Sequence, residues 1–201
     1  MNTPKHQRAV IFDVGGVLVD YDRDGTLATI AAKCGVEISG DDIAALIASL
    51  DLSEGTRTIS DLFDLLVSQH GFRGNLDDLH QIWSAGLAAR PWVPELLTAL
   101  AEKATLYILS DTNAVHWQRI TNGLLPCHSF SEIFLSHEFH LTKHRLEAFR
   151  YVLARIPYAP GEILFIDDTF EHVERARQVG LIGHHFRDQN VMRTALSEHV
   201  V

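Results

Sequence analysis

The feature that most constrains the fold is a set of short apolar runs that are continuous instead of alternating. They are AVIFD (9–13), ATLYILS (104–110), EIFLS (132–136), EILFID (162–167) and LIGHHF (181–186). Alternation would indicate strands with one wet face, whereas continuous runs are typical of strands covered on both faces. The pattern therefore predicts a parallel sheet between two layers of helices.

Helical periodicity separates these runs. Apolar residues recur at helical spacing in three stripes: Leu96, Leu97 and Leu100; Leu146, Phe149, Leu153 and Ile156; Val173, Ala176 and Val179. Parallel strands need long crossovers, and a helix is the usual one. Strand–helix alternation therefore predicts a doubly wound, Rossmann-like α/β sheet.

Residues 21–90 follow a different pattern, with no convincing strand. Their apolar residues form three helical stripes: Ile43, Leu46, Ile47 and Leu50; Leu62, Leu65 and Leu66; Leu79, Ile82 and Trp83. We therefore predict an α/β core from 1–20 and 91–201, interrupted by an all-helical cap at 21–90.

Composition narrows the possible partners. The 201 residues include 26 acidic and 17 basic side chains, a net charge of −9, which argues against a nucleic-acid surface. No run approaches the roughly 20 apolar residues of a membrane span. Cys34 and Cys127 stand far apart without a pairing motif, which favours reduced thiols and a cytoplasmic protein. The oligomeric state cannot be read from the sequence.

Polar residues end the predicted strands. They are Asp13, then Ser110, Asp111 and Asn113, then Asp167 and Asp168, with Lys143 shortly after the third apolar run. Ligands of open parallel sheets bind outside the carboxyl ends of the strands. Alone, each residue has a simpler explanation: Asp13 can accept turn amides, and the Asp167–Asp168 pair can cap a helix near residue 169. Their coincidence at successive strand ends favours a functional site.

The order of these residues resembles the haloacid dehalogenase superfamily, whose members are mostly phosphatases. VIFDVGGVL is similar to its nucleophile motif, LYILSDTN to its second motif and ILFIDDTFEHVERARQVG to its fourth, with Lys143 at the third. EGTRTISDLF and RPWVPELLTAL resemble a branch that contains sugar-1-phosphate phosphatases. The resemblance covers nearly the whole chain and implies a helical cap after the first motif.

The resemblance also implies roles. Asp13 and Lys143 would be catalytic, Asp13 forming an aspartyl-phosphate. Mg²⁺ would be held by Asp13, the Gly15 carbonyl and Asp168, with Asp167 at or near its shell. The phosphate would lie among Gly15, Gly16, Ser110, Asp111, Asn113 and Lys143. Oxygen ligands suit Mg²⁺, which also offsets repulsion between an anionic nucleophile and phosphate. The implied substrate is a small phosphorylated metabolite.

Three departures from the family pattern stand out. Most family phosphatases carry a second aspartate two positions after the nucleophile, where this chain has Gly15. The motif lysine is usually followed by proline, here His144, and often preceded at three residues by glycine, here His140. The missing acid leaves two alternatives open: a metal-independent 2-haloacid dehalogenase, which Asp167–Asp168 disfavours, and a binding protein without turnover.

The histidines could suggest a zinc site. His137, His140 and His144 form one group, and His184 and His185 form another, but no HExxH or Cys/His spacing occurs. From the sequence we interpret them as solvated or polar-rim residues.

Overall fold

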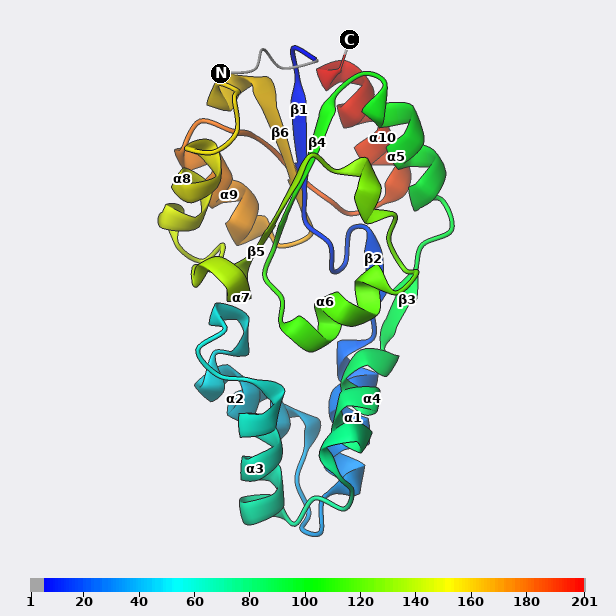
Figure 1. Ribbon diagram of the computed structural model, residues 1–201, viewed down its shortest axis with the longest axis vertical. Helices are drawn as coiled ribbons and strands as arrows, with labels where there is room; N and C mark the ends of the chain where they lie inside the picture. The colour runs from blue at the N-terminus through cyan, green and yellow to red at the C-terminus, as the bar shows by residue number, and fades with distance from the viewer. Residues whose placement is uncertain (1–5, 201) are drawn as a thin grey trace.

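A computed structural model describes residues 6–200. Its centre is a five-stranded parallel sheet in the order β5-β4-β1-β6-β7 (Figure 1). The strands are β1 (Ala9–Phe12), β4 (Thr105–Ser110), β5 (Glu132–Leu135), β6 (Ile163–Asp167) and β7 (Ile182–His185). Each lies within one of the five apolar runs, so the predicted α/β sheet is confirmed.

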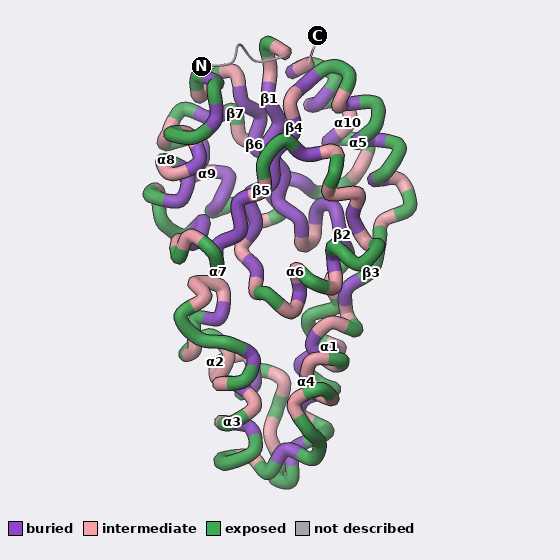
Figure 2. The backbone as a smooth tube through the Cα atoms, viewed as in Figure 1, coloured by how far each residue is buried: buried purple, intermediate pink, exposed green. Residues whose placement is uncertain are grey.

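Alternate residues of the central strand point into two different apolar layers. Val10 and Phe12 of β1 pack in one cluster, and Ala9 and Ile11 in the other. All four side chains are buried, with exposed fractions of 1% or less. Figure 2 shows the strands as the buried centre of this half of the molecule. Burial on both faces is the physical reason for the continuous apolar runs.

Helices cover both faces of the sheet. The first cluster includes side chains from α5 (Val93–Ala101), α6 (Ala114–Thr121) and α10 (Gln189–His199). The second includes side chains from α8 (Leu146–Leu153) and α9 (Phe170–Gln178). Shorter helical turns complete the core: α7 (Ser136–Phe139), η2 (Cys127–Ser129) and η3 (Pro160–Glu162).

A helical insert follows β1 and extends from the carboxyl edge of the sheet (Figure 1). It contains α1 (Arg23–Lys33), α2 (Gly40–Leu50), η1 (Leu52–Glu54), α3 (Ile59–His70) and α4 (Leu76–Ala85). These helices bury an apolar cluster of their own, whose fully buried members include Ile30, Ile43, Leu62, Leu66 and Leu79. The insert therefore has an independent core.

A short antiparallel ribbon joins the insert to the sheet. It pairs β2 (Val19–Tyr21) with β3 (Leu87–Ala89), so residues 21–90 include a strand that their sequence pattern does not indicate. Arg90 stabilises this junction by donating to the Val17 carbonyl at 3.0 Å and pairing with Asp20 at 2.8 Å. Three-residue strands carry too little periodicity to be recognised in a sequence.

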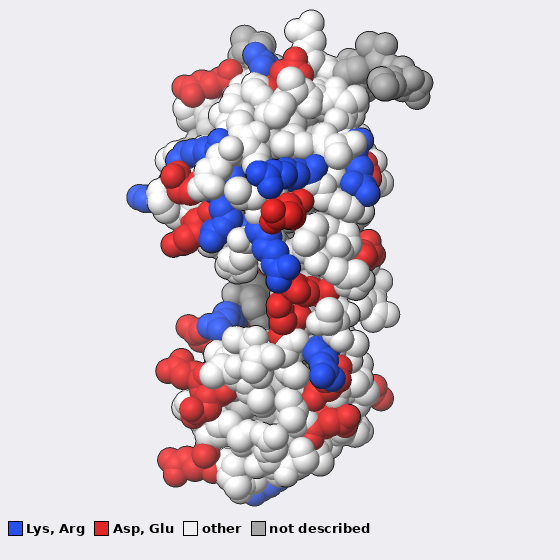
Figure 3. Space-filling model, turned by 90° about the vertical axis from the view of Figure 1, so that its left-hand side faces the viewer, with Lys and Arg blue, Asp and Glu red and all other residues white. Residues whose placement is uncertain are grey.

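Charge is unevenly divided between the two regions. The insert, taken as residues 22–86, has eleven acidic and four basic side chains and thus most of the net negative charge. Figure 3 shows acidic side chains over the lower half and a concentration of Lys and Arg over the upper half. Within residues 6–200, no helix combines the length and apolar character needed to cross a membrane.

Candidate active site

A buried ion cluster lies where β1 and β6 end. Lys143 Nζ lies 2.9 Å from Asp13 Oδ1 and 2.6 Å from Asp167 Oδ2, and its side chain is only 1% exposed. Asp13 directly follows β1, Asp167 ends β6, and Lys143 comes from the loop before α8. The parallel pairing of β1 with β6 places the two carboxylates side by side. Three segments predicted from sequence to converge therefore do so.

Burial and charge act differently on these three groups. Burial, together with the nearby charge of Asp167, raises the pKa of Asp13 to about 8, although Lys143 opposes the shift. Burial also acts to raise the pKa of Asp167, but the charge of Lys143 and the hydrogen bond from His172 outweigh it and leave that pKa well below its usual range. Burial acts to lower the pKa of Lys143, and the carboxylates of Asp13 and Asp167 reverse it, so the ammonium stays charged.

A third carboxylate completes an oxygen-rich site. Oxygen atoms of Asp13, Asp167 and Asp168 all lie within 4.8 Å of one another. A carboxylate-only donor set of this size fits Mg²⁺, which takes oxygen ligands and retains waters. Burial raises the pKa of Asp168, and the Asp167 charge adds to this shift; a bound dication would oppose both effects.

Gly15 and Gly16, which follow Asp13, differ in how well each position would tolerate a side chain. Gly16 has φ +75°, a backbone conformation that L side chains rarely adopt, and a Cβ there would displace the Asp168 carboxylate. Its N–H donates to the Val19 carbonyl at 2.9 Å. This differs from the expected amide contact with phosphate, because the loop turns back here into β2. A Cβ on Gly15 would meet nothing within 4 Å.

The end of β4 contributes the next group. Ser110 is buried at the strand end, and Asn113 begins α6 by accepting the His116 N–H at 3.1 Å. Both carboxylate oxygens of Asp111 accept the backbone N–H of Lys143 at 3.1 Å. The Asp111 side chain thus holds the loop that carries Lys143. Only the backbone of Asp111 is then left to bind phosphate.

A cavity of about 300 Å³ lies between this edge of the sheet and the insert. Gly15, Ser110, Asp111 and Asn113 line it from the sheet side. The insert adds Arg23 and Asp51 together with apolar side chains, which include Leu27, Ile47, Leu52 and Trp83. The cavity is large enough for a small molecule and combines charged with apolar walls.

Two contacts hold the insert against the core beside this cavity. On one side Trp83 of α4 stacks on His116 of α6, with ring centroids 5.2 Å apart, and His116 Nε2 donates to the Trp83 carbonyl at 2.9 Å. On the other side Glu54 of η1 pairs with Arg145 at 2.9 Å, and its carbonyl accepts from His140 Nδ1 at 2.7 Å.

Acidic residues near the site differ in their availability as proton donors. Asp20 is paired with Arg90, Asp22 accepts the Gly25 N–H at 2.9 Å as the cap of α1, and Asp24 is 96% exposed. Asp51, by contrast, lines the cavity from the insert. Asp51 is therefore placed to face a ligand that also lies against Gly15.

The structure adds two residues that sequence reasoning missed. Ser136, fully buried after β5, accepts the Thr112 N–H at 3.0 Å and so fixes the loop after β4. His172, in the first turn of α9, lies with Nδ1 3.2 Å from Asp167 Oδ1. Ser136 ends a predicted strand and could have been found by that rule. His172 gave no such indication, because only the start of α9 turns it back toward the strand end.

The simple capping explanation does not account for the acidic pair, because α9 has no side-chain cap. Asp167 Oδ1 accepts the Thr169 N–H at 2.8 Å in the turn that leads into α9. The same carboxylate also binds Lys143 and His172, so this turn contact is only one of its contacts.

Fold and site together define an α/β protein with an acidic, lysine-bridged ligand site at the carboxyl edge of a parallel sheet. A family model described as haloacid dehalogenase-like hydrolase matches residues 7–180. The chain belongs to the haloacid dehalogenase-like hydrolases.

Two curated relatives are phosphatases by name. The chain is 25% identical over 186 residues to a sesquiterpene phosphatase of Aspergillus oryzae, a match that covers 90% of each chain. It is also 25% identical over 189 residues to D-ribitol-5-phosphate phosphatase of Bacteroides thetaiotaomicron, covering 85% of this chain and 87% of that one.

Solved structures share the fold. A family enzyme of Bacteroides thetaiotaomicron, in complex with magnesium and inorganic phosphate, matches with a TM-score of 0.80 at 23% identity and covers 92% of this chain and 98% of its own. An L-2-haloacid dehalogenase of Xanthobacter autotrophicus matches with a TM-score of 0.61 at 19% identity and covers 96% and 84%.

Proposed function

We propose that the protein is a Mg²⁺-dependent phosphatase that hydrolyses a small phosphorylated metabolite through an aspartyl-phosphate on Asp13. The observation that carries this proposal is the pairing of Asp13 and Asp167 with the buried ammonium of Lys143, with the Asp168 carboxylate beside them. The phosphatase names of two relatives, and the magnesium and phosphate bound in a structural neighbour, support it.

Asp13 is the proposed nucleophile. Lys143 holds its Oδ1, so we assign the attack on phosphorus to Oδ2. The new bond joins this oxygen to phosphorus as the bond from phosphorus to the substrate oxygen breaks, which divides one difficult displacement into two easier ones. Water then attacks the phosphorus of the aspartyl-phosphate and returns Asp13 as a free carboxylate.

Other groups bind and orient the phosphate. The Lys143 ammonium and the Ser110 hydroxyl are the proposed contacts for phosphate oxygens, with the Gly15 and Asp111 backbones and Asn113 beside them. Asp13, Asp167, Asp168 and the Gly15 carbonyl would hold Mg²⁺, which supplies positive charge to offset repulsion between the nucleophile and the phosphate. Gly16 makes room for the Asp168 carboxylate.

The insert, which we propose is a cap domain formed by about residues 21–90, limits the substrate. The cavity of about 300 Å³ beneath it suits a small molecule and leaves little room for a protein chain. Gly15 provides no acid to protonate the leaving group, which favours an anomeric sugar phosphate or an acyl phosphate, whose leaving groups are weak bases. We place the protein in the cytoplasm, since Cys34 and Cys127 are free thiols.

A phosphate-release screen tests the proposal. Sugar phosphates, acyl phosphates and nucleotides are incubated with the full chain, with and without Mg²⁺. We expect Mg²⁺-dependent release from at least one of the first two classes, and a loss of at least about 10⁴-fold in Asp13→Asn, which cannot form the covalent intermediate. Circular dichroism and thermal unfolding check that this variant is folded.

Three results would contradict the proposal. Chloride release from chloroacetate without metal would identify a dehalogenase. Tight binding of a phosphorylated ligand with no turnover under any metal would identify a binding protein. Phosphate release that Asp13→Asn leaves unchanged would place the chemistry elsewhere.

A further inference from the structure

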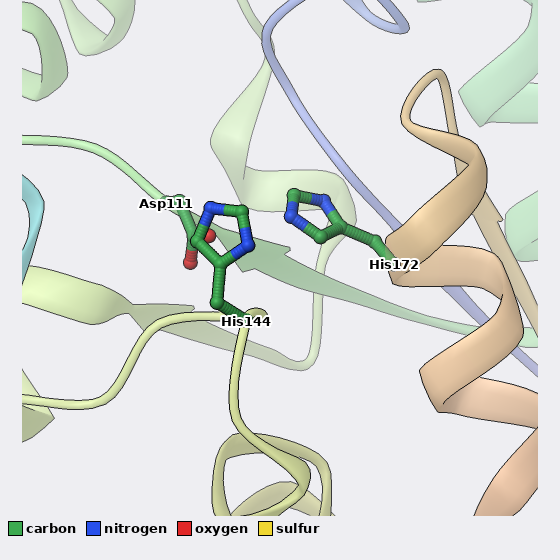
Figure 4. A group of neighbouring side chains, drawn as sticks. All are labelled: Asp111, His144 and His172. Carbon is green, nitrogen blue, oxygen red and sulfur yellow. The ribbon is translucent and has the colours of Figure 1, made fainter.

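A second group of potential metal ligands lies beside the ion cluster, since His172 contacts Asp167 and Asp111 contacts the Lys143 N–H. We call Asp111, His144 and His172 the histidine–aspartate cluster. Its members come from the loop after β4, the loop before α8 and the first turn of α9, and one ligand atom of each lies within 4.8 Å of the others. Figure 4 shows the imidazoles turned toward each other with the Asp111 carboxylate beside His144. The ring centroids of His144 and His172 are 4.9 Å apart.

His172 is oriented as a metal-binding histidine would be. Its Nδ1 lies 3.2 and 3.3 Å from the two oxygens of Asp167, so Nδ1 carries the proton and donates it to that carboxylate. Nε2 is then an acceptor that faces the histidine–aspartate cluster (Figure 4). A carboxylate that fixes the far nitrogen of a ligating imidazole is a regular feature of metal sites.

The Nε2 atom of His172 is unsatisfied. The side chain is only 9% exposed, and this nitrogen has no hydrogen-bond partner among the residues that the structure describes. Buried polar atoms without a partner are rare, and an ion is one recognised explanation. This observation is independent of the spacing of the three side chains and indicates a ligand at the same point.

The other two members are available to an ion in different ways. Asp111 accepts the Lys143 N–H through both oxygens, which fixes the carboxylate while each oxygen keeps a further lone pair. His144 is exposed, so its imidazole can rotate and leaves a path for entry. Two ligands about 2.1 Å from one ion are at most about 4.2 Å apart, so closure needs only a small movement, which His144 can supply.

We propose that the histidine–aspartate cluster binds a transition-metal dication, with Zn²⁺ the best fit, separately from the carboxylate site of Asp13, Asp167 and Asp168. Two imidazole nitrogens and one carboxylate oxygen suit Zn²⁺ and Co²⁺, whereas Mg²⁺ prefers oxygen alone. The ion links three loops that carry the site: the end of β4, the Lys143 loop and the start of α9. This binding does not depend on the proposed phosphatase activity.

The sequence interpretation of His144 changes accordingly. Its neighbours His137 and His140 in the chain are not part of the histidine–aspartate cluster. The ligands come instead from segments about 30 residues apart, which no local motif could show.

Cobalt absorption and zinc competition test the site directly. Full-length protein is saturated with Mg²⁺ to occupy the carboxylate site and then titrated with Co²⁺, followed by visible absorption. We expect one Co²⁺ per chain, with d–d bands that Zn²⁺ abolishes. His144→Ala changes an exposed side chain and should weaken Co²⁺ binding at least about 100-fold; His172→Asn, which keeps a donor toward Asp167, should do the same.

Two further variants locate the ion. His128→Ala removes an exposed histidine outside the histidine–aspartate cluster, and Asp168→Asn removes a carboxylate of the other site; both should keep the cobalt spectrum. Absence of a Co²⁺ band in the Mg²⁺-saturated protein would overturn the proposal. So would binding that survives His144→Ala, or binding that His128→Ala or Asp168→Asn abolishes.

Discussion

The carboxyl edge of the sheet buries the three charged groups at its centre, Asp13, Lys143 and Asp167, whereas the helical insert keeps most of its own charged groups in contact with solvent. Lys143 and Asp167 are 1% and 0% exposed, and each contacts an opposite charge. In the insert, acidic side chains instead cap helices: Asp42 and Asp78 accept backbone N–H groups at the starts of α2 and α4. In the function we propose, charge serves ligand chemistry at the sheet edge, whereas in the insert it stabilises helices.

This difference indicates how each region tolerates change. A buried charge depends on its partner, because an unpaired ion in a low-dielectric interior is costly. An exposed carboxylate that accepts an N–H at the start of a helix is screened by solvent and can be replaced without wider effects. We therefore expect mutations at the sheet edge to be severe and those on the insert surface to be mild.

Lys143→Met tests the expectation that mutations at the sheet edge are severe. It leaves Asp13 and Asp167 buried without their cation, and we expect the free energy of unfolding to fall by about 3–5 kcal/mol. Mg²⁺ should restore more stability to this variant than it adds to the wild type, because it replaces the missing positive charge. Thermal and denaturant unfolding, with and without Mg²⁺, measure both effects. The control is Lys103→Met on an exposed lysine; equal small losses in the two variants would contradict this account.

The junction between the regions should be sensitive to acid. Burial lowers the pKa of His116 to about 4, whereas an unfolded histidine has a pKa of about 6.5. Below pH 6.5 the unfolded chain therefore binds more protons than the folded chain. The contribution of neutral, buried His116 to the free energy of unfolding is complete above pH 6.5 and is lost as the pH falls toward 4.

The expected loss is up to about 3 kcal/mol. Denaturant unfolding between pH 7 and 4 measures it, with His116→Gln as the matched variant that keeps an N–H for the Trp83 carbonyl and cannot titrate. Parallel pH profiles of the two proteins would show that His116 is not the acid-sensitive group.

Gly15→Asp tests the missing acid. A Cβ at this position meets nothing within 4 Å, so the variant should fold. The new carboxyl would supply general acid–base catalysis, and we expect phosphate release from alkyl phosphates, whose leaving groups need a proton, to increase about 100-fold. Release from acyl phosphates, measured in parallel, should change little. A uniform decrease for both classes would show that the position is occupied by substrate.

The mildest expected effect is at the second contact between the regions. Arg145→Gln breaks the pair with Glu54 across the insert and core, and a half-exposed pair contributes no more than about 1 kcal/mol. We expect KM for the best substrate to rise about two- to fivefold with kcat nearly unchanged. Arg150→Gln, which breaks the exposed pair with Glu147 within α8, is the control. An equal KM in the two variants would show that the contact between Arg145 and Glu54 does not affect substrate binding.

Much of the α/β core could be predicted, because continuous apolar runs and polar strand ends are local sequence features that recur along the chain. The five apolar runs became the five strands, and Asp13, Lys143 and Asp167 converge because parallel strands end at one edge. The β2–β3 ribbon could not be predicted, since its three-residue strands are formed by pairing between segments almost 70 residues apart.

The same distinction applies to the site. Sequence by itself determined the sheet, the helical insert and the residue types at the strand ends, because burial and backbone periodicity act on neighbouring residues. Only the tertiary structure decided that Asp111 holds the Lys143 loop, that Gly16 makes room for Asp168, and that His144 meets His172. These are contacts between distant segments, and their geometry depends on how whole elements pack.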